Sequence, residues 1–210
     1  MRKHFAGLAL VALLALAPAY AQAPKGWKMH TDHSSEASDP DAPGVDKFTV
    51  SGSGFHAVNP MAAIYWSPTN TVTGSYTLKG TFKLIKSMGF NEYYGLIFGG
   101  SSLEGATQSY LYFMVTDDGT YLIKRRDGTS TQGVSNKTPS DAVKKPDAGG
   151  SATNALEVRV KPDKVEFVIN GTVVSTMPKT GPLAKTDGVY GIRINHQLEV
   201  QIDGFTLSKM

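Results

Sequence analysis

Cysteine is absent from this chain of 210 residues, and its absence excludes several kinds of chemistry. The chain has no disulfide, no thiol nucleophile and no cysteine metal ligand, so its hydrophobic core alone must stabilise the fold. A large excess of one charge is also missing, because 21 Lys and Arg residues face 18 Asp and Glu residues. Nucleic-acid-binding proteins carry clustered basic surfaces, whereas the longest run of Lys and Arg here is Lys124-Arg125-Arg126. The sequence therefore predicts no nucleic-acid partner.

Long apolar runs are equally scarce, since the one clear example covers residues 5–17. It follows the basic residues Arg2, Lys3 and His4 and precedes Ala19-Tyr20-Ala21. A span of the bilayer needs about 20 apolar residues, so this run is too short to cross one. The pattern is typical of a secretory signal peptide. We expect residues 1–21 to be that signal peptide, with a secreted or periplasmic mature chain starting near Gln22 and no membrane insertion after cleavage.

Glycine, proline and short alternating apolar runs dominate what remains, with 22 Gly and 11 Pro in the chain. Such runs between turn residues predict antiparallel strands. Residues 22–46 are expected to form a polar N-terminal arm, and residues 127–153 a long polar connection. The expected strands are 47–50, 55–58, 62–66, 75–86, 93–98, 110–116, 121–126, 156–160, 164–169, 172–176, 189–195 and 198–207.

So many strands cannot remain a single flat sheet. Two sheets packed face to face would bury one side of each, as the alternation requires. We therefore expect an all-β, two-sheet antiparallel β-sandwich of the jelly-roll type over residues 47–210. Asp118-Gly119 and Asn170-Gly171 predict tight hairpin turns, and Asp203-Gly204 predicts a bulge in the last strand.

The first of these hairpins predicts how its side chains divide between two faces. A two-residue turn at Asp118-Gly119 would pair Tyr112 with Arg125 and place both beside Tyr110. Sugar-binding sites combine aromatic rings with a few polar side chains. We therefore expect Tyr110, Tyr112, Arg125, Arg193, Asn195, His196 and Trp66 to bind ligand. Leu111, Phe113, Val115 and Leu122 would then fill the core. The alternative is ordinary packing of tyrosines at sheet edges with arginines covering apolar surface.

Catalytic and metal-binding patterns are weak. Glycoside hydrolysis normally uses two carboxyl groups, but Glu157, Glu166 and Glu199 each stand alone on an alternating strand. We therefore assign no catalytic residue.

The acidic residues between Asp32 and Asp46 form a pattern that begins like a calcium-binding loop at Asp39. Its third ligand position is Pro43 and its twelfth residue is Val50, so a solvated loop is favoured. No cofactor or metal is expected, with calcium as the alternative. His30 and His33 could share a metal if their segment were helical, but Asp32 and Ser34-Ser35 indicate a loop.

Several motifs near the end of the chain resemble a known superfamily. They are residues 154–160, Asn170-Gly171, residues 188–193 and Asp203-Gly204-Phe205. Together with the hairpin around Asp118-Gly119, they are similar to the concanavalin A-like lectin/glucanase superfamily. The resemblance is greatest to laminin-G-like and 3-keto-disaccharide hydrolase-type domains of exported bacterial proteins.

This resemblance implies a jelly roll and a carbohydrate partner. Our leading hypothesis is an exported carbohydrate- or glycoconjugate-binding sandwich without an evident catalytic pair. One alternative is a hydrolase acting on 3-keto-disaccharides or related glycosides, although Gly26-Trp27 is only half of that family's opening motif. Another is an envelope module for protein binding or adhesion. The sequence carries no signal for the oligomeric state.

Overall fold

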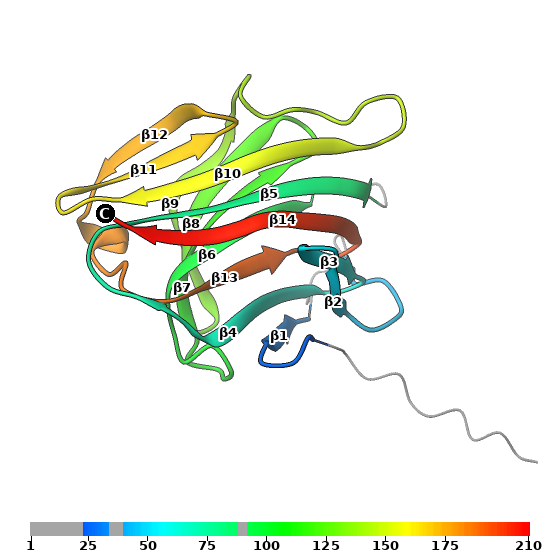
Figure 1. The fold of residues 1–210 in the computed structure, drawn as a ribbon, viewed down its shortest axis with the longest axis horizontal. Coiled ribbons are helices and arrows are strands. Elements are labelled where there is room, and N and C mark those ends of the chain that lie inside the picture. The colour runs from blue at the N-terminus through cyan, green and yellow to red at the C-terminus, as the bar shows by residue number, and fades with distance from the viewer. Residues whose placement is uncertain (1–22, 34–39, 88–91) are drawn as a thin grey trace, which may run out of the picture.

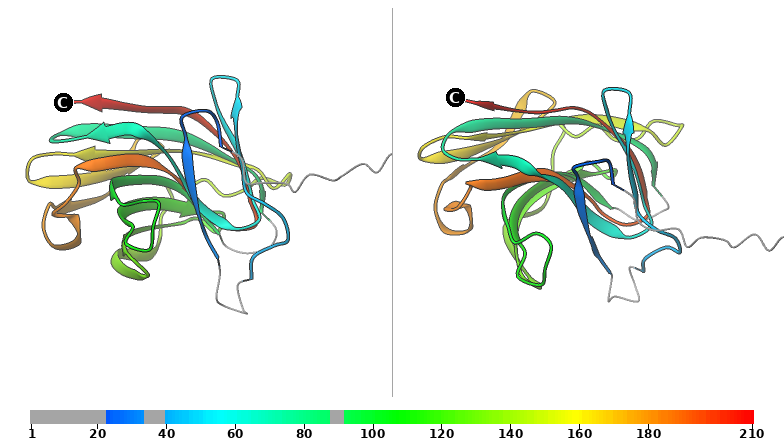
Figure 2. Two further views of the ribbon diagram at one scale, coloured as in Figure 1. Left: turned by 90° about the horizontal axis from the view of Figure 1, so that it is seen from below. Right: turned by 60° about the horizontal axis from the view of Figure 1, so that its bottom comes forward.

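The computed structural model describes residues 23–33, 40–87 and 92–210. Within these residues the chain forms fourteen β-strands and one short 3-10 helix, η1 (Gly181–Leu183). The strands form two antiparallel sheets of seven, stacked as two layers (Figures 1 and 2). The predicted all-β sandwich is confirmed. The expected signal peptide, residues 1–21, lies outside the described residues, as do Glu36 and Asp39 of the acidic arm.

Sheet I is the layer that carries the site described below. Its strand order is β1-β4-β13-β6-β7-β8-β9. The bounds are β1 (Lys28–Asp32), β4 (Ala62–Val72), β13 (Gly188–Ile194), β6 (Tyr93–Ser101), β7 (Ser109–Thr116), β8 (Thr120–Asp127) and β9 (Ser130–Pro139).

Sheet II is the second layer, and it faces the viewer in Figure 1. Its order is β12-β11-β10-β5-β14-β3-β2. The bounds are β12 (Thr172–Pro178), β11 (Lys164–Ile169), β10 (Ala152–Val160), β5 (Tyr76–Ser87), β14 (Leu198–Lys209), β3 (Gly54–Asn59) and β2 (Lys47–Ser51).

The main core lies between the two sheets and follows from the alternation in each strand. Phe82 and Leu84 of β5 point into it from sheet II, while Leu111 and Phe113 of β7 point into it from sheet I. All four side chains are fully buried. Because successive side chains of a strand point to opposite faces, the residues between these positions lie on the outer faces of the sheets.

Two strands were not predicted from the sequence, and both are edges of sheet I. β1 lies inside the stretch expected to be a polar arm, and β9 lies inside the expected polar connection 127–153. Edge strands often carry polar residues, because one side of the backbone meets water rather than another strand. The Ser- and Thr-rich sequence of β9 therefore resembles a loop, although it pairs with β8 from Asp127↔Ser130 to Thr120↔Pro139.

The turn between β7 and β8 differs from the prediction by one residue. Gly119 has a φ of 88°, whereas Asp118 is not among the described residues with positive φ. A two-residue type I′ turn needs positive φ at both positions. The chain instead turns through three residues, 117–119, and pairs Val115 with Tyr121 and Tyr112 with Lys124.

This shift moves every side chain of β8 to the other face. Leu122, predicted to be in the interlayer core, lies on the outer face of sheet I. Tyr121 and Ile123 fill the interlayer core instead. Arg125 pairs with Leu111 rather than with Tyr112, and Arg126 takes the place beside Tyr110.

Two other local predictions are confirmed. Asn170 and Gly171 both have positive φ, at 51° and 84°, as a type I′ hairpin requires. The pairing of β14 with β5 shifts between Asp203 and Thr206, and Gly204 has a φ of 58°, which marks the expected bulge.

Candidate functional site

A second apolar cluster covers the outer face of sheet I, away from the interlayer core. We call this surface, together with the polar groups that lie on it, the aromatic face. Its tyrosines alternate along β7 with residues that point into the core, so their position follows from the strand pattern. The cluster consists of Ile64, Trp66, Ile97, Leu103, Tyr110, Tyr112, Met114 and Leu122.

Arg193 of β13 is the central polar residue of the aromatic face. Its Nη1 donates hydrogen bonds to Oδ2 of Asp32 at 2.8 Å and to the hydroxyl of Tyr110 at 2.6 Å. Its Nε donates to Oδ1 of Asn195 at 3.2 Å. The guanidinium carbon lies 5.6 Å from the centroid of the Tyr112 ring, close enough for a cation–π contact. The structure thus brings together residues that are far apart in the sequence.

Asp32, at the end of β1, is shared by several donors. Besides Arg193, its carboxylate accepts hydrogen bonds from Nε2 of Gln108 at 3.2 Å and Nη2 of Arg126 at 3.4 Å. His30 Nε2 lies 3.6 Å from the same carboxylate. One carboxylate therefore lies between two guanidinium groups.

The contact between Asp32 and Arg126 reveals the shape of the sheet. β1 and β8 are separated in sheet I by β4, β13, β6 and β7. In a flat sheet, strands that far apart would lie about 24 Å from each other, much farther than these side chains reach. Sheet I must therefore curl around the aromatic face, and the lower layer in Figure 2 follows that curvature. The curvature explains why Tyr110 is fully buried without belonging to the interlayer core.

Burial and charge act against each other in this network. Burial alone would raise the pKa of Asp32, but the charges of Arg193 and Arg126 and the hydrogen bonds lower it below its usual value. Burial would lower the pKa of Arg193, but Tyr110 and Asp32 raise it above its usual value. The pKa values of Tyr110 and Tyr112 are raised, chiefly by burial. At neutral pH the centre therefore holds a carboxylate, guanidinium cations and neutral phenols.

A hollow of about 400 Å³ lies beside Trp66 on the same side of sheet I. Trp66, Pro68, Leu103 and Val189 supply apolar atoms to it, and Glu104 lies at its border. Gly191 pairs with Trp66, and a Cβ at position 191 would lie 2.2 Å from the carbonyl oxygen of Tyr65. Glycine is therefore needed for the close approach of β4 and β13 beneath the hollow.

The predicted site residues fall into two groups. Tyr110, Tyr112, Arg193 and Asn195 lie together, and Trp66 belongs to the same apolar cluster as the two tyrosines. Arg125 and His196 do not lie among them. Whether any of these residues binds ligand stays a prediction.

Arg125 is held at the edge of the sandwich. It donates hydrogen bonds to Oγ of Ser109 at 2.7 Å and to the carbonyl oxygens of Pro182 and Lys185, both at 3.4 Å. Its position is the direct result of the three-residue turn, and its contacts fasten the η1 segment to β8.

His196 is buried at the turn between β13 and β14. Its Nδ1 lies 3.3 Å from a carboxylate oxygen of Asp41, and its Nε2 lies 3.1 Å from one of Glu92. His196 therefore connects this turn to the segments that carry Asp41 and Glu92. Gln197 donates a further hydrogen bond to the carbonyl oxygen of Pro40 at 2.6 Å.

Four residues of the aromatic face were missed from the sequence: Asp32, Gln108, Lys124 and Arg126. The alternation in residues 28–32 is a weak signal for Asp32, because Met29 packs against the core while His30 and Asp32 face outward. Gln108 lies in a loop, where no periodicity applies. Lys124 and Arg126 were missed because the turn was predicted one residue too short, which placed both on the other face of the sheet.

The acidic residues of the arm that the structure describes have internal partners. Oδ2 of Asp46 accepts a hydrogen bond from Thr31 at 2.7 Å, and its Oδ1 accepts one from the amide of Met61 at 3.0 Å. Burial raises the pKa of Asp46. Within the described ranges, no group of three or more His, Asp or Glu side chains is arranged to hold a metal ion. Nor does any helix there have the length and apolar character needed to cross a membrane.

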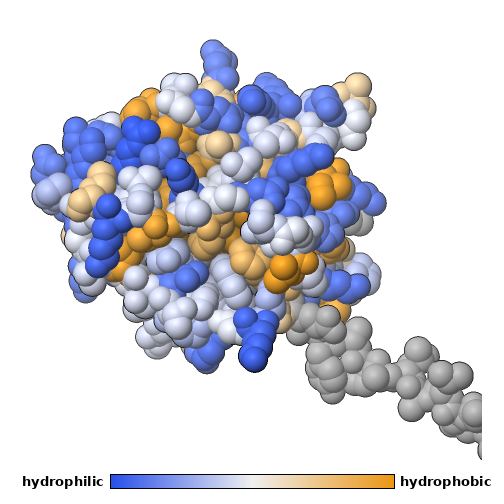
Figure 3. All heavy atoms as spheres, viewed as in Figure 1, coloured by the Kyte–Doolittle hydropathy of each residue, from blue (hydrophilic) through white to orange (hydrophobic). Residues whose placement is uncertain are grey.

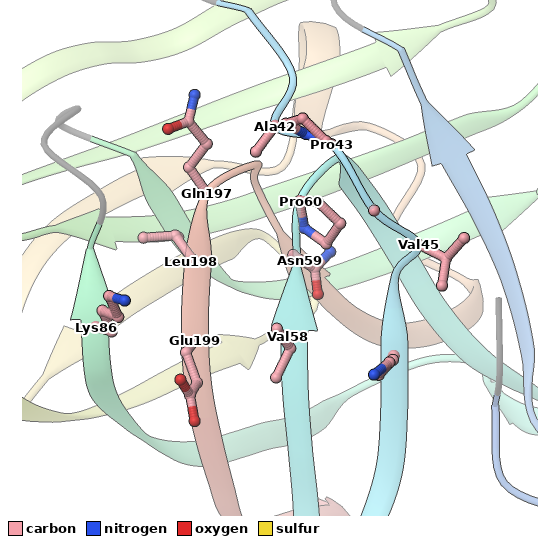
Figure 4. Close-up of a pocket in the computed structure, with 12 residues that line it drawn as sticks. Ala42, Pro43, Val45, Val58, Asn59, Pro60, Lys86, Gln197, Leu198 and Glu199 are labelled. Atoms are coloured by element: carbon pink, nitrogen blue, oxygen red, sulfur yellow. The ribbon is translucent and has the colours of Figure 1, made fainter. Parts of the chain in front are cut away.

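A groove of about 450 Å³ lies on the other layer, between β3, β14 and the segment around Pro43 (Figure 4). Val58, Pro60 and Leu198 form apolar parts of it, and its lining residues include no aromatic ring. Figure 3 views the molecule from this side, where hydrophilic and hydrophobic residues are interspersed. This groove therefore lacks the flat rings on which a sugar would stack.

Comparisons with known proteins identify the fold. No family model matches the sequence, and no curated protein matches it. Among solved structures, the carbohydrate-binding module CBM66 from Bacillus subtilis matches with a TM-score of 0.60 and 10% identity, covering 88% of this chain and 96% of that one.

Two further solved structures have the same architecture. A protein of unknown function with a galectin-like fold, also from Bacillus subtilis, matches with a TM-score of 0.61 and 14% identity, covering 88% of this chain and 90% of that one. The metal-free carbohydrate recognition domain of Emp46p matches with a TM-score of 0.53 and 11% identity, covering 87% of each chain. At these identities the likeness shows the fold alone. The chain is a jelly-roll β-sandwich, as the resemblance found in the sequence implied.

Proposed function

We propose that this chain is an exported carbohydrate-binding β-sandwich whose ligand surface is the aromatic face of sheet I. The observation that carries the proposal is the assembly of Arg193, Tyr110 and Tyr112 on the outer side of the sheet. A pyranose has an apolar face that stacks on aromatic rings, while its hydroxyls need a few fixed polar partners. Tyr110 is fully buried and fixes Arg193 by a hydrogen bond, while Trp66 borders a hollow in which a sugar ring can lie.

The similar structures support this proposal by their fold. CBM66 is a carbohydrate-binding module, and the Emp46p domain is a carbohydrate recognition domain. A jelly roll also hosts other functions, so the site must carry the argument.

Binding without catalysis fits the carboxylate of the aromatic face and the two paired glutamates on sheet II. A glycoside hydrolase needs a carboxylic acid with a raised pKa beside a second carboxylate. Asp32 has a lowered pKa and lies between two arginines. On sheet II, Glu157 pairs with Arg159 at 2.7 Å and Glu199 with His56 at 3.0 Å. These ion pairs favour structural roles for the glutamates.

Export is the part of the proposal that rests on sequence alone. The basic start, the apolar run 5–17 and Ala19-Tyr20-Ala21 form the pattern that a signal peptidase reads. Mass spectrometry of the mature protein tests this directly. We expect an N-terminus at Gln22 in the periplasm or the medium; an uncleaved chain in the cytoplasm would contradict it.

The two tryptophans of the chain provide a sharp binding test. Trp66 borders the proposed site, whereas Trp27 packs against Phe48 and Phe55 at ring distances of 5.2 and 4.6 Å. We expect a glycan from a diverse panel to change the fluorescence of the wild type and of Trp27→Phe, but not that of Trp66→Phe. Calorimetry on the same samples gives the affinity. Silence of the wild type across the panel, with and without calcium, would overturn the proposal.

A further inference from the structure

Resting on the proposed function, we infer that the ligand of the aromatic face is an acidic sugar, a uronate whose carboxylate is bound by Lys124 and Arg126. The inference concerns the charge of the face rather than its shape. It goes beyond carbohydrate binding in general, because a neutral sugar would leave the surplus positive charge of this face without an anion.

The positions of the cations follow from the observed pairing of β7 with β8. Lys124 pairs with Tyr112 and Arg126 pairs with Tyr110, so both basic side chains share the outer face with the tyrosines. Arg193 reaches the same tyrosines from β13.

The rows of paired residues connect these cations to the hollow beside Trp66. Trp66 pairs with Gly191, Gly191 with Ile97, Ile97 with Tyr112 and Tyr112 with Lys124. One line across the sheet therefore runs from an aromatic hollow to a lysine. An oligosaccharide that follows this line would pass from the hollow beside Trp66 to the basic side chains at its other end.

The charges of this face do not balance. Arg193 and Arg126 share Asp32, whose carboxylate accounts for one positive charge. Among the described residues, no carboxylate lies within 4.0 Å of Lys124, and Arg126 has Asp32 as its one acidic neighbour at 3.4 Å. Lys28 and Glu104, at the far end of the row, neutralise each other. Lys124, Arg126 and Arg193 thus face one carboxylate.

A surplus of positive charge is more consequential here than on an open surface. The buried side chains of Tyr110, Tyr112, Met114 and Leu122 lie beside it on the same face of the sheet. Charges interact more strongly in such surroundings than in bulk water, and partly buried cations without a counter-ion favour an incoming anion. Arg126 and Arg193 already share the carboxylate of Asp32, so a carboxylate is an anion that fits this face.

A uronate matches this combination of groups. Its ring carries apolar C–H bonds for the aromatic side chains, and its carboxylate accepts hydrogen bonds from a guanidinium and an ammonium group. Arg126 has a side chain 19% exposed, and Lys124 is half-buried, so both can contact a ligand on the outer face of sheet I.

The test compares oligogalacturonate with the methyl ester of the same oligomer, in which each carboxylate is replaced by an uncharged ester. Calorimetry is carried out on the whole mature protein, with oligomannuronate and a glucuronate disaccharide as further acidic probes, each beside its own methyl ester. We expect at least one acidic probe to bind at least roughly fivefold more tightly than its ester. That binding should weaken as the salt concentration rises from about 50 to about 300 mM, because salt screens the attraction.

Matched variants separate the site from the overall charge. Lys124→Gln and Arg126→Gln should each weaken acidic-sugar binding by roughly fivefold and weaken binding of the ester by a smaller factor. Lys83→Gln removes one charge from an exposed position on sheet II and should have no effect. Circular dichroism melting curves establish that each variant is folded.

Every outcome either supports the inference or overturns it. Tighter binding of an acid than of its ester, lost in Lys124→Gln and Arg126→Gln alone, supports it. Equal affinity for acid and ester, or equal loss in all three variants, overturns it. The inference is also overturned if dextran sulfate binds as tightly as every uronate. If a neutral glycan binds through Trp66 while all uronates fail, the inference falls and the proposed function stands. If nothing binds, both fall.

Discussion

Asp32 of β1 and Arg193 of β13 form an ion pair of 2.8 Å across 161 residues of sequence. The pair fastens an edge strand of sheet I to the centre of the aromatic face. Its geometry depends on the curvature of the whole sheet, so its disruption should affect more than a local contact.

Replacing Asp32 by Asn should destabilise the protein by about 3 kcal/mol, because a buried guanidinium loses its counter-charge. Urea denaturation at neutral pH measures the change in the free energy of unfolding. Glu104→Gln is the matched control, since Glu104 is 66% exposed in its pair with Lys28, and surface pairs contribute about 0–1 kcal/mol. Equal effects of the two substitutions would contradict the role assigned to Asp32.

The lowered pKa of Asp32 also predicts how stability depends on pH. The pKa in the folded protein lies below the unfolded value of about 3.9. The stabilisation is therefore complete above that value and is lost as pH falls through the folded pKa. Asp46 has a raised pKa and acts in the opposite direction. The informative quantity is the difference in unfolding free energy between wild type and Asp32→Asn, which should shrink below about pH 4; a constant difference would contradict the prediction.

Arg125 and Arg126 are neighbours with different expected roles. Arg125→Gln should loosen the η1 segment, because Arg125 donates to the carbonyl oxygens of Pro182 and Lys185. We expect a loss of about 1 kcal/mol in unfolding free energy and faster hydrogen exchange in residues 181–186, with ligand affinity unchanged. Arg126→Gln should instead change ligand affinity. If Arg125→Gln changed ligand affinity and Arg126→Gln did not, the result would favour the pairing of β8 that a two-residue turn produces.

Asn170 at the β11–β12 turn should tolerate substitution poorly. Its Oδ1 accepts the amide of Ala155 at 2.8 Å, and its Nδ2 donates to Ala142 and Asn154, both at 2.8 Å. Asn170→Ala should cost about 2–3 kcal/mol by thermal or chemical unfolding. Gly171→Ala, where only the positive φ is at issue, should cost about 1 kcal/mol. A larger loss for Gly171→Ala would contradict this account.

Gly191→Ala tests the close approach of β4 and β13. The added Cβ would lie 2.2 Å from the carbonyl oxygen of Tyr65 and 3.1 Å from the Cβ of Trp66. We expect a loss of about 2 kcal/mol or more, together with a changed emission spectrum of Trp66. Gly105→Ala is the control, because no atom lies within 4 Å of its Cβ position. Unchanged stability of Gly191→Ala would show that the strands adjust without cost.

The accuracy of the sequence-based predictions depended on the range of the interactions involved. Phe82 and Leu84 were assigned correctly because the two-residue period of a strand is local. Asn170-Gly171 was assigned correctly because both residues tolerate positive φ. Asp117-Asp118-Gly119 allows a turn of two or of three residues, so the partner of Tyr112 could not be fixed from these residues. The polar edge strands β1 and β9 gave little apolar signal.

The amino-acid sequence by itself determined the all-β class, the alternating core and most of the strand positions, since these follow from hydrophobic period and turn chemistry within short segments. Only the tertiary structure decided that Asp32 meets Arg193 and Arg126, and that the tyrosines of β7 line a curled outer face. The physical reason is that sheet curvature is a collective property of seven paired strands, and no single segment encodes it.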